Sequence, residues 1–559
     1  MKARHILAAG LGLLGMVASC VPVDRSLGQD FLGKNQQYEI YTAEFPLEDI
    51  RMDYPEELSS YSNYRFNIGA IRDELFGLTT RSTTFTLVPI LDSLDFGKPG
   101  TQVFRQFHFT APIDTLSYIE ENQRHIFQNI NVYEVEEYVD IMKSVPEVKH
   151  GKTRITRGVP VYDGSDSLSF DFTKEFALKY MAMKTEDLDS LHLYSKKFPG
   201  IYLDTDAPRG NGGRINMFKL PIDVAKGYIY GAYAELKFSA EYEGRGMVDT
   251  AFYYTLGPLG LYDFKEVTST STAKYPQAAL NISSSESKDL KGKAGEVYYL
   301  EGGKGVKPVI SADGLRKLVM EEVGRHGHDP KDIVISNANI TLPFIFPDNY
   351  KDMVYYPTTI SPTCRLVDDE GNVIFANLTD SNVSTENQGG INRSTCVYAP
   401  DITHHVQELV SLKNTDKISN YDIWFLPVAV ENTTTAASQA EAQDQYQSYM
   451  NNLSYSQYIN NMYGYGGYGG YGGYGYGGYG GYGGYGYGGY GGYGGYGYGG
   501  YGSNYYYYLA AQNAASSYTG TQTESLLDLG RFYKGVFAGP ESKGKSVPKL
   551  SITYAVPVK

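Results

Sequence analysis

The most evident chemistry in this chain is that of its cysteines. The 559-residue sequence has three of them, Cys20, Cys364 and Cys396. Cys20 directly follows the small residues Ala18 and Ser19, at the end of an apolar run from Ile6 to Val17. A cysteine placed directly behind such a run and two small residues is typical of one that becomes the mature N-terminus and is acylated. We therefore predict that Cys20 is lipidated.

The segment before Cys20 supports this interpretation. Lys2, Arg4 and His5 precede the apolar run, which is too short to span a bilayer. Residues 1–19 resemble a bacterial lipoprotein signal peptide, and residues 20–37 are rich enough in Pro, Gly and polar side chains to form a lipidated tether. An ordinary signal peptide that happens to end in Cys is the weaker alternative. Residue 21 is Val rather than Asp, which by analogy favours the outer membrane, on either its periplasmic or its cell-surface face.

Cys364 and Cys396 are the two cysteines left for the folded body. In an exported, oxidising setting a disulfide between them is the economical prediction. In the chain-entropy model such a bond stabilises the fold by roughly 3–4 kcal/mol. Two buried thiols are the alternative. Neither cysteine has a histidine nearby in sequence, so a zinc site or a Cys–His nucleophile is not indicated.

Histidines and carboxylates offer few further candidates. Residues 325–329, Arg-His-Gly-His-Asp, could suggest a metal, but they follow a predicted helix and precede a strand, which favours a solvated turn. His404 and His405 are adjacent on a short helix and diverge, so we expect them on the surface. Asp204, Asp206 and Asn211 mimic part of a calcium loop without its full spacing or terminal Glu. We predict no metal and no cofactor.

Glycine-rich and catalytic motifs are also weak. Gly302 to Val306, Gly-Gly-Lys-Gly-Val, lacks the Gly-Lys-Ser/Thr ending and the preceding apolar strand of a phosphate-binding loop, so we interpret it as a turn. The sequence contains no Gly-x-Ser-x-Gly elbow, zincin helix or dinucleotide fingerprint. These observations favour a non-enzymatic protein. An enzyme ranks third among the possible classes, because a large β-sandwich can hold carboxylates that one sequence does not reveal.

The elements that would carry any site are mainly strands. From Ala234 to Tyr242 apolar and polar residues alternate strictly, which predicts a half-buried strand. Similar runs occur at 83–90, 103–109, 129–135, 215–220, 251–256, 338–346, 421–430 and 549–556. Helical patterns are sparse: Ser311 can cap a helix that ends near Gly324, and a second helix is predicted over 402–412.

Length, charge and spacing suggest the domain organisation. The net charge of −14 and the pI near 5.2 argue against nucleic acid as a partner. No later segment approaches eighteen uninterrupted apolar residues. We predict a mainly β fold with two tandem, jelly-roll-like β-sandwiches. They cover 38–260 and 296–559, with a linker over 261–295.

A low-complexity insertion interrupts the second predicted domain over 433–523. Within it, residues 463–502 contain only Tyr and Gly, in an eleven-residue repeat. Such a segment cannot bury enough apolar surface to offset its backbone entropy, so we expect disorder. The tyrosines could stack on sugars or on other aromatic chains. A recently expanded, tolerated surface loop is the favoured alternative.

Several segments resemble a known family. They are Phe66 to Gly77, Ile113 to Leu116, Phe198 to Gly212, Asn337 to Pro343, Asp401 to Leu409, Tyr421 to Pro427 and Pro548 to Tyr554. Their order behind a lipidation signal resembles the DUF4270 lipoproteins of Bacteroidota. The resemblance covers nearly all of the mature chain outside the insertion. It implies an accessory outer-membrane lipoprotein, one that works with outer-membrane protein assembly or with surface-lipoprotein export.

Two function classes follow. The first is a non-enzymatic accessory or scaffolding component of an envelope protein complex, held to the membrane by its lipid and bound to outer-membrane protein partners. The alternative is a glycan-binding surface lipoprotein, because tyrosine is abundant outside the repeat as well. A row of aromatic residues on an exposed sheet face would favour sugar, whereas a broad apolar patch would favour a protein partner.

Overall fold

The structure is a computed structural model of the whole chain, and it describes residues 37–434 and 521–558 with short gaps. The gaps are 59, 63, 91–93, 115–125, 140–144, 146, 190, 226–227, 258–276, 368–370, 372, 384–388 and 544–545. The predicted signal peptide, Cys20, nearly all of the predicted tether and the Tyr/Gly repeat therefore lie outside the described residues.

The fold is mainly β, as the sequence predicts, and every strand pair in the described ranges is antiparallel. The largest sheet has thirteen strands. Its main path runs β10 (Ser167–Asp171), β6 (Val103–Pro112), β15 (Tyr233–Tyr242), β16 (Gly246–Gly257), β5 (Gly77–Pro89), β11 (Ile201–Thr205), β7 (Gln128–Val135) and β8 (His150–Arg154). The strands off this path are β3 (Ser60–Ser62), β4 (Arg65–Asp73), β9 (Val161–Tyr162), β12 (Gly212–Lys219) and β17 (Ala279–Ser285).

Four smaller sheets complete the described fold. A seven-stranded sheet contains β18 (Gly292–Lys293), β2 (Ile50–Asp53), β20 (Lys307–Ile310), β26 (Ile423–Thr434), β22 (Thr359–Val367), β23 (Val373–Asn377) and β27 (Thr521–Leu527). A five-stranded sheet runs β1 (Tyr38–Pro46), β29 (Lys549–Pro557), β21 (Val334–Pro343), β25 (Val397–Tyr398) and β24 (Ile391–Asn392). The two strand pairs are β13 (Asp223–Ala225) with β14 (Tyr228–Tyr230), and β19 (Val297–Glu301) with β28 (Lys534–Ala538).

Helices are short and lie between the strands. The α-helices are α2 (Lys174–Met181), α3 (Leu191–Lys197), α5 (Ala312–Arg325), α6 (Asp380–Val383) and α7 (Thr403–Ser411). The 3-10 helices are η3 (Thr185–Leu188), η5 (Glu286–Leu290), η6 (Pro330–Asp332), η7 (Tyr350–Tyr355) and η8 (Ile418–Tyr421). The prediction for α5 is confirmed, since the Ser311 hydroxyl accepts a hydrogen bond from the backbone N–H of Gly314 at 3.2 Å. The helix predicted over 402–412 is α7.

The described residues form two large hydrophobic cores, which are not built from consecutive halves of the sequence. One core gathers residues of β1, β2 and the segment between them, and also Ile71, Phe76 and Ile215, with residues from Ala294 to Val556. This happens because β1 pairs with β29 along nine residues and β2 pairs with β20. The predicted N-terminal sandwich therefore begins too early: residues 38–53 belong to the sheets of the C-terminal half.

The predicted linker over 261–295 is also wrong for the part that the structure describes. Residues 279–285 form β17, which pairs with β5 and β3 in the thirteen-stranded sheet. Ser283 and Ser285 on β17 are buried, so a serine-rich segment that looks linker-like is in fact a strand with a polar buried face. The second core contains Ala279 from β17 and residues from Phe66 to Leu256.

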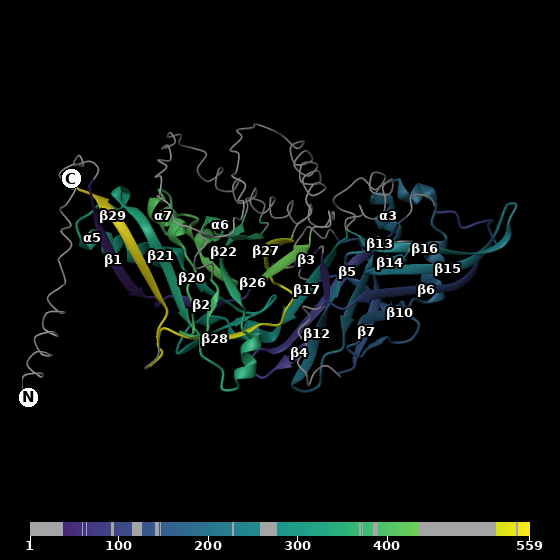
Figure 1. The fold of residues 1–559 in the computed structure, drawn as a ribbon, viewed down its shortest axis with the longest axis horizontal. Helices are drawn as coiled ribbons and strands as arrows, with labels where there is room; N and C mark the ends of the chain where they lie inside the picture. The colour runs from purple at the N-terminus through teal and green to yellow at the C-terminus, as the bar shows by residue number, and fades with distance from the viewer. Residues whose placement is uncertain are drawn as a thin grey trace, which may run out of the picture.

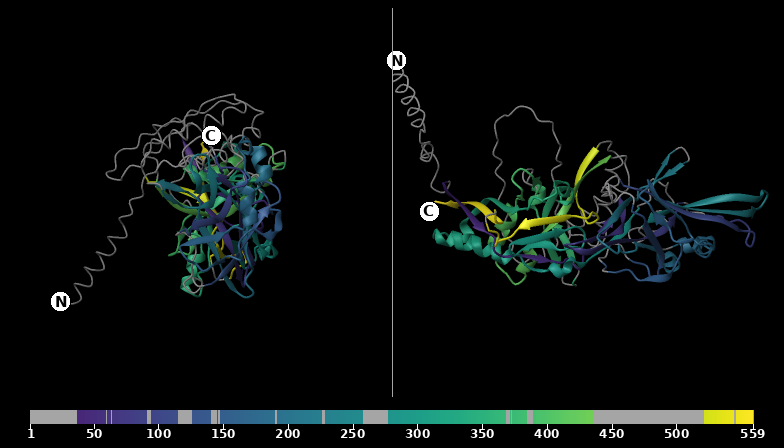
Figure 2. Two further views of the ribbon diagram at one scale, coloured as in Figure 1. Left: turned by 90° about the vertical axis from the view of Figure 1, so that its right-hand side faces the viewer. Right: turned by 90° about the horizontal axis from the view of Figure 1, so that it is seen from below.

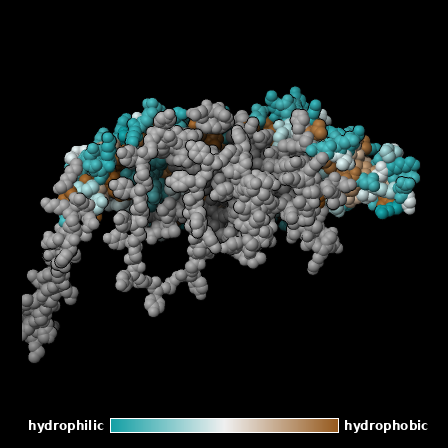
Figure 3. Space-filling view, turned by 90° about the horizontal axis from the view of Figure 1, so that it is seen from above, coloured by the Kyte–Doolittle hydropathy of each residue, from teal (hydrophilic) through white to brown (hydrophobic). Residues whose placement is uncertain are grey.

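The two cores form an elongated body (Figure 1). β1, β29, β21 and α5 lie at one end of the long axis, and β6, β15 and β16 lie toward the other, an arrangement that is also visible from below (Figure 2). Hydrophilic side chains predominate at both ends on the face shown in Figure 3. The first described strand thus lies at one end of the molecule.

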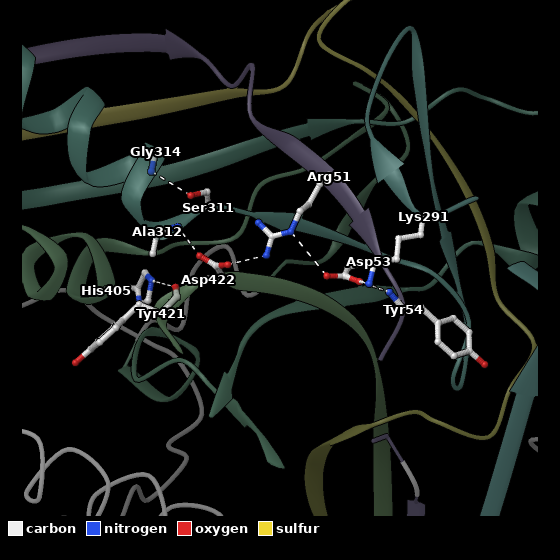
Figure 4. Close-up of polar contacts among 10 residues, drawn as sticks. All are labelled: Arg51, Asp53, Tyr54, Lys291, Ser311, Ala312, Gly314, His405, Tyr421 and Asp422. Atoms are coloured by element: carbon white, nitrogen blue, oxygen red, sulfur yellow. Dashed lines mark hydrogen bonds and ion pairs between the residues drawn. The ribbon is translucent and has the colours of Figure 1, made fainter. Parts of the chain in front are cut away.

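Polar contacts hold the N-terminal segment on the C-terminal core (Figure 4). The Arg51 guanidinium lies 2.6 Å from Asp422 and 3.8 Å from Asp53, and Lys291 is 2.7 Å from Asp53. Asp422 also accepts a hydrogen bond from the backbone N–H of Ala312 at 2.9 Å, at the N-terminus of α5, where a helix favours an anion. β2 is therefore fixed to both α5 and the loop before β26.

Candidate functional site

A cleft of about 420 Å³ lies where the thirteen-stranded sheet meets the C-terminal core. One wall is formed by the turn between β4 and β5 and by the start of β12. The other wall is formed by residues 345–348, which follow β21, by η7 and by β28. The volume is within the usual range for small-ligand sites, roughly 300–1,000 Å³. The lining combines aromatic rings with carboxylates, which makes this cleft the strongest candidate for a binding site.

Tyr356 fixes the wall on the C-terminal side. Its hydroxyl donates a hydrogen bond to the carbonyl oxygen of Ile345 at 2.7 Å and accepts one from the backbone N–H of Val536 at 3.4 Å. The backbone N–H of Ile345 donates to the carbonyl of Val536 at 2.8 Å. Burial raises the pKa of Tyr356 to about 12, so this hydroxyl keeps its proton at neutral pH. The segment after β21 is thus held against β28.

Aromatic side chains line this wall from the interior to the surface. Phe532 is buried and meets Tyr355 edge to face at a ring-centroid distance of 5.9 Å, and Phe76 at 6.5 Å. Phe346 lies in the lining and is 47 % exposed, and Tyr350 on η7 is 71 % exposed. Exposed large apolar side chains next to a concave site are available to contact a ligand.

Charged groups line both walls. On the β4–β5 turn, Asp73 pairs with Lys534 at 2.8 Å, and Glu74 accepts a hydrogen bond from the Asn211 amide at 3.0 Å. Arg72 lies 3.4 Å from Glu286, whose carboxylate is not part of the lining. Four carboxylates and two cations line the cleft: Asp73, Glu74, Asp348 and Asp352, with Arg72 and Lys534. The cleft is therefore acidic, and both of its cations are engaged with carboxylates.

A second polar group, the buried Lys307–Glu301 cluster, lies at the same junction. The Lys307 ammonium is fully buried and donates to three backbone carbonyls, those of Glu301, Gly303 and Gly305. The Glu301 carboxylate is also fully buried and accepts hydrogen bonds from the hydroxyls of Thr79 and Ser285. Strands β5 and β17 thus meet β19 and β20 around two buried charges.

Burial shifts the pKa of each charged group in this cluster. It lowers the pKa of Lys307 to about 7 and raises that of the Glu301 carboxyl. Nearby Arg81 is 1 % exposed, and burial lowers its pKa as well. Because every ammonium proton of Lys307 has a carbonyl acceptor, the cluster is satisfied internally and suits a structural role.

The Gly302–Val306 segment is a turn, as predicted, and the carbonyl groups of its Gly303 and Gly305 accept hydrogen bonds from Lys307. A phosphate-binding loop would instead present backbone N–H groups to an anion. Here the N–H of Lys304 donates to the Ser283 hydroxyl at 2.6 Å, and that of Val306 donates to Ser287 at 3.0 Å. The loop therefore connects two sheets by enclosing a lysine, and its geometry does not suit a nucleotide.

The predictions for the histidines are confirmed in part. His405 is 2 % exposed, so its expected place on the surface is wrong, whereas His404 is exposed. The Nε2 of His405 lies 3.0 Å from the carbonyl oxygen of Tyr421 (Figure 4), and burial lowers the pKa of His405 to about 4. Residues 326–327 form the exposed turn that the sequence predicts, and the half-buried His328 after it lies with its Nε2 3.1 Å from the Tyr41 hydroxyl on β1.

The partial calcium motif is not assembled. The Asn131 amide donates to Asp204 at 2.9 Å and to Asp206 at 3.0 Å, and Asn129 donates to Asp206 at 2.8 Å. Asn211 bonds to Glu74 on the cleft instead. Within the described ranges, no three His, Cys, Asp or Glu side chains are placed to hold a metal ion.

Cys364 and Cys396 are free cysteines, so the predicted disulfide is not formed. Cys364 lies on β22 in the seven-stranded sheet, whereas Cys396 directly precedes β25 in the five-stranded sheet. Cys364 is buried, and burial raises the pKa of its thiol well above the usual range. The alternative of two buried thiols is met for Cys364 only, because Cys396 is free but partly exposed.

Comparison with known proteins identifies no relative. No family model matches the chain, and neither a curated protein nor a solved structure shows significant similarity. Within the described ranges, no helix is both long enough and apolar enough to span a membrane.

Proposed function

We propose that this protein is a non-enzymatic outer-membrane lipoprotein, anchored through Cys20, that serves as an accessory or scaffolding component of an envelope protein complex. The observation that carries the proposal is the position of β1. It begins at Tyr38, eighteen positions after Cys20, and lies at one end of an elongated body (Figure 1). A lipid on the tether would hold that end near the membrane and leave the far core free to meet partners.

A scaffold also needs a fixed relation between its parts. Three contacts connect the two sides of the junction: Ser283 on β17 accepts the backbone N–H of Lys304, Ser285 on β17 donates to Glu301, and Asp73 pairs with Lys534. Such connections across a junction oppose hinge motion between domains. We propose that the body moves as one unit.

The proposal also includes the family of the protein and the envelope process in which it takes part. The order of segments that resembles the DUF4270 lipoproteins of Bacteroidota favours outer-membrane protein assembly or surface-lipoprotein export as the setting. The acidic cleft gives such a component a place to receive a partner.

Tagged, lipidated protein extracted from outer membranes in mild detergent should retain a stoichiometric outer-membrane barrel or other lipoproteins, identified by mass spectrometry.

Cys20→Ala is the matched variant for this experiment, with Cys396→Ala as its control. We expect Cys20→Ala alone to leave the membrane fraction and to lose the partners. Recovery of the lipidated protein without any partner would overturn the scaffolding proposal.

Glycan binding is the second candidate, and the exposed ring of Phe346 in the cleft lining favours it. Other exposed aromatic residues lie elsewhere: Tyr38 is on β1 and Phe127 directly precedes β7, in a different sheet. They do not form the row on one sheet face that a sugar platform would use. Protein binding is therefore the first choice.

A further inference from the structure

We propose that the acidic, aromatic cleft binds a basic segment of a partner protein, with an arginine or lysine side chain entering between Asp348, Asp352 and Glu74. This inference rests on the proposed scaffolding function, because it assigns the surface that the partner would occupy. The ligand class follows from the charge of the cleft, from its apolar walls and from its position.

Charge complementarity is the first argument. The two cations of the lining, Lys534 and Arg72, already lie against Asp73 and Glu286. The carboxylates of Glu74, Asp348 and Asp352 have no cation among the other lining residues within ion-pair distance in the described structure. An incoming guanidinium or ammonium group would supply the missing positive charge, and charge-assisted hydrogen bonds to carboxylates are stronger than neutral ones.

The apolar part of the cleft fits the rest of such a side chain. Arg and Lys carry long aliphatic stems that pack on apolar surface while the charged head stays polar. Phe346 is 47 % exposed in the lining, which also contains Pro347 and Asp348, the next two residues in the sequence. A cation over an aromatic face gains further stabilisation. A neutral sugar would use the rings but would leave the carboxylates without a counter-charge.

Electrostatic steering supports the same ligand class. The chain carries a net charge of −14. A negative protein surrounding a negative cleft attracts positive segments and repels acidic ones, mainly by raising the association rate. Binding should therefore weaken as the salt concentration increases.

The test is a titration of the purified, lipidated protein in an uncharged detergent, followed by fluorescence anisotropy. The probe is a fluorescein-labelled peptide of glycine and serine with two arginines, and its matched control carries neutral citrulline in place of both arginines. We expect saturable binding of the arginine peptide at about 150 mM salt, with much weaker binding of the citrulline peptide. Equal binding of the two peptides would overturn the proposal.

Two double variants locate the site. Asp348→Asn with Asp352→Asn removes two charges from the cleft, whereas Glu321→Gln with Asp416→Asn removes two charges from exposed positions outside it. Both variants have the same net charge. We expect the first to weaken binding about tenfold and the second to leave it nearly unchanged. Equal losses in both variants would show general attraction only and would overturn the assignment to the cleft.

Chitotetraose is the competing probe for sugar binding. If it quenches the protein fluorescence in a way that Phe346→Ala abolishes, while the arginine peptide does not bind, the cleft is a sugar site and the proposal fails. The pull-down separates this failure from failure of the scaffolding function. Partners retained equally by wild type and by the Asp348→Asn/Asp352→Asn variant would overturn only the cleft, whereas absence of partners from wild type would overturn the scaffold.

Discussion

Lys534 and Asp73 form an ion pair of 2.8 Å across the junction of the two cores. Asp73 belongs to β4 in the thirteen-stranded sheet, and Lys534 begins β28. The second carboxylate oxygen of Asp73 accepts the backbone N–H groups of Leu75 at 2.8 Å and Phe76 at 3.1 Å, so it also fixes the β4–β5 turn. One side chain thus orders a wall of the cleft and connects it to the other core.

Lys534→Gln should strengthen binding of the arginine peptide. The substitution removes a cation from the lining and leaves Asp73 without its partner, so the cleft becomes more negative. We expect the peptide to bind about two- to fivefold more tightly and the free energy of unfolding to fall by about 1 kcal/mol or less, since the pair is partly solvated. Anisotropy titration and urea denaturation measure the two effects.

Lys549→Gln is the control for that substitution, because Lys549 pairs with Glu44 on the exposed face of β1 and β29, outside the cleft lining. It changes the net charge equally and should leave peptide affinity nearly unchanged. Weaker peptide binding by Lys534→Gln would contradict a cation-binding cleft.

Lys307→Met should destabilise the protein strongly. It deprives the buried backbone carbonyls of Glu301, Gly303 and Gly305 of their shared donor. A buried polar group left without a hydrogen-bond partner typically costs about 1–3 kcal/mol, so three such carbonyls should lower the free energy of unfolding by several kcal/mol. Lys288→Met, at an exposed lysine on η5, is the control and should change the urea midpoint little. If Lys307→Met lowers the free energy of unfolding by less than about 1 kcal/mol, this cluster does not hold the cores together.

Gly302→Ala and Gly324→Ala should have opposite effects on stability. A Cβ at Gly302 would lie 2.3 Å from the carbonyl oxygen of Arg531 and 2.8 Å from the backbone nitrogen of Tyr533, so the backbones would have to separate. We expect the free energy of unfolding of Gly302→Ala to be lower by about 1–3 kcal/mol. A Cβ at Gly324, on the exposed side of α5, would meet nothing within 4 Å and should stabilise the helix by about 0.5–1 kcal/mol. Thermal melts of both variants provide the measurement, and equal melting temperatures would contradict the close approach.

Local patterns explain which elements could be predicted from the sequence. β15 follows the alternation of residues 234–242, and α5 follows its Ser311 cap and its apolar stripe. Helix α2 was missed, although its signal is present: Thr173 caps it, and Phe176, Ala177, Tyr180 and Met181 form its buried face. That segment is short and lies between strand-like runs, where periodicity is ambiguous.

Long-range pairing could not be predicted from one sequence. Thr42 and Thr553 face each other although 511 positions separate them, and Asp73 and Lys534 are 461 positions apart. A single chain contains no local signal for such contacts, so the sequence does not predict that these residues share a cleft, and Asn211 stands out only as part of a calcium-like motif. Lys304 and Gly302 belong to a weak glycine-rich motif, but their role at the junction depends on residues distant in sequence, Ser283 and Tyr533.

The buried imidazole of His405 should make stability depend on pH. Burial lowers its folded-state pKa to about 4, whereas the unfolded chain titrates near the ordinary value of 6.5. Between these values the unfolded state binds a proton that the folded state does not, so the free energy of unfolding falls as the pH is lowered from 6.5 toward 4. From pH 7 to pH 5 the protonation of this histidine should lower the free energy of unfolding by about 2 kcal/mol.

His405→Gln retains a side-chain N–H for the Tyr421 carbonyl and cannot titrate, so its urea midpoint should fall less over that range than the wild-type midpoint does. His404→Gln changes the exposed neighbour and should retain the full wild-type slope. If both variants show the same pH dependence, the imidazole of His405 is not the group that senses acid.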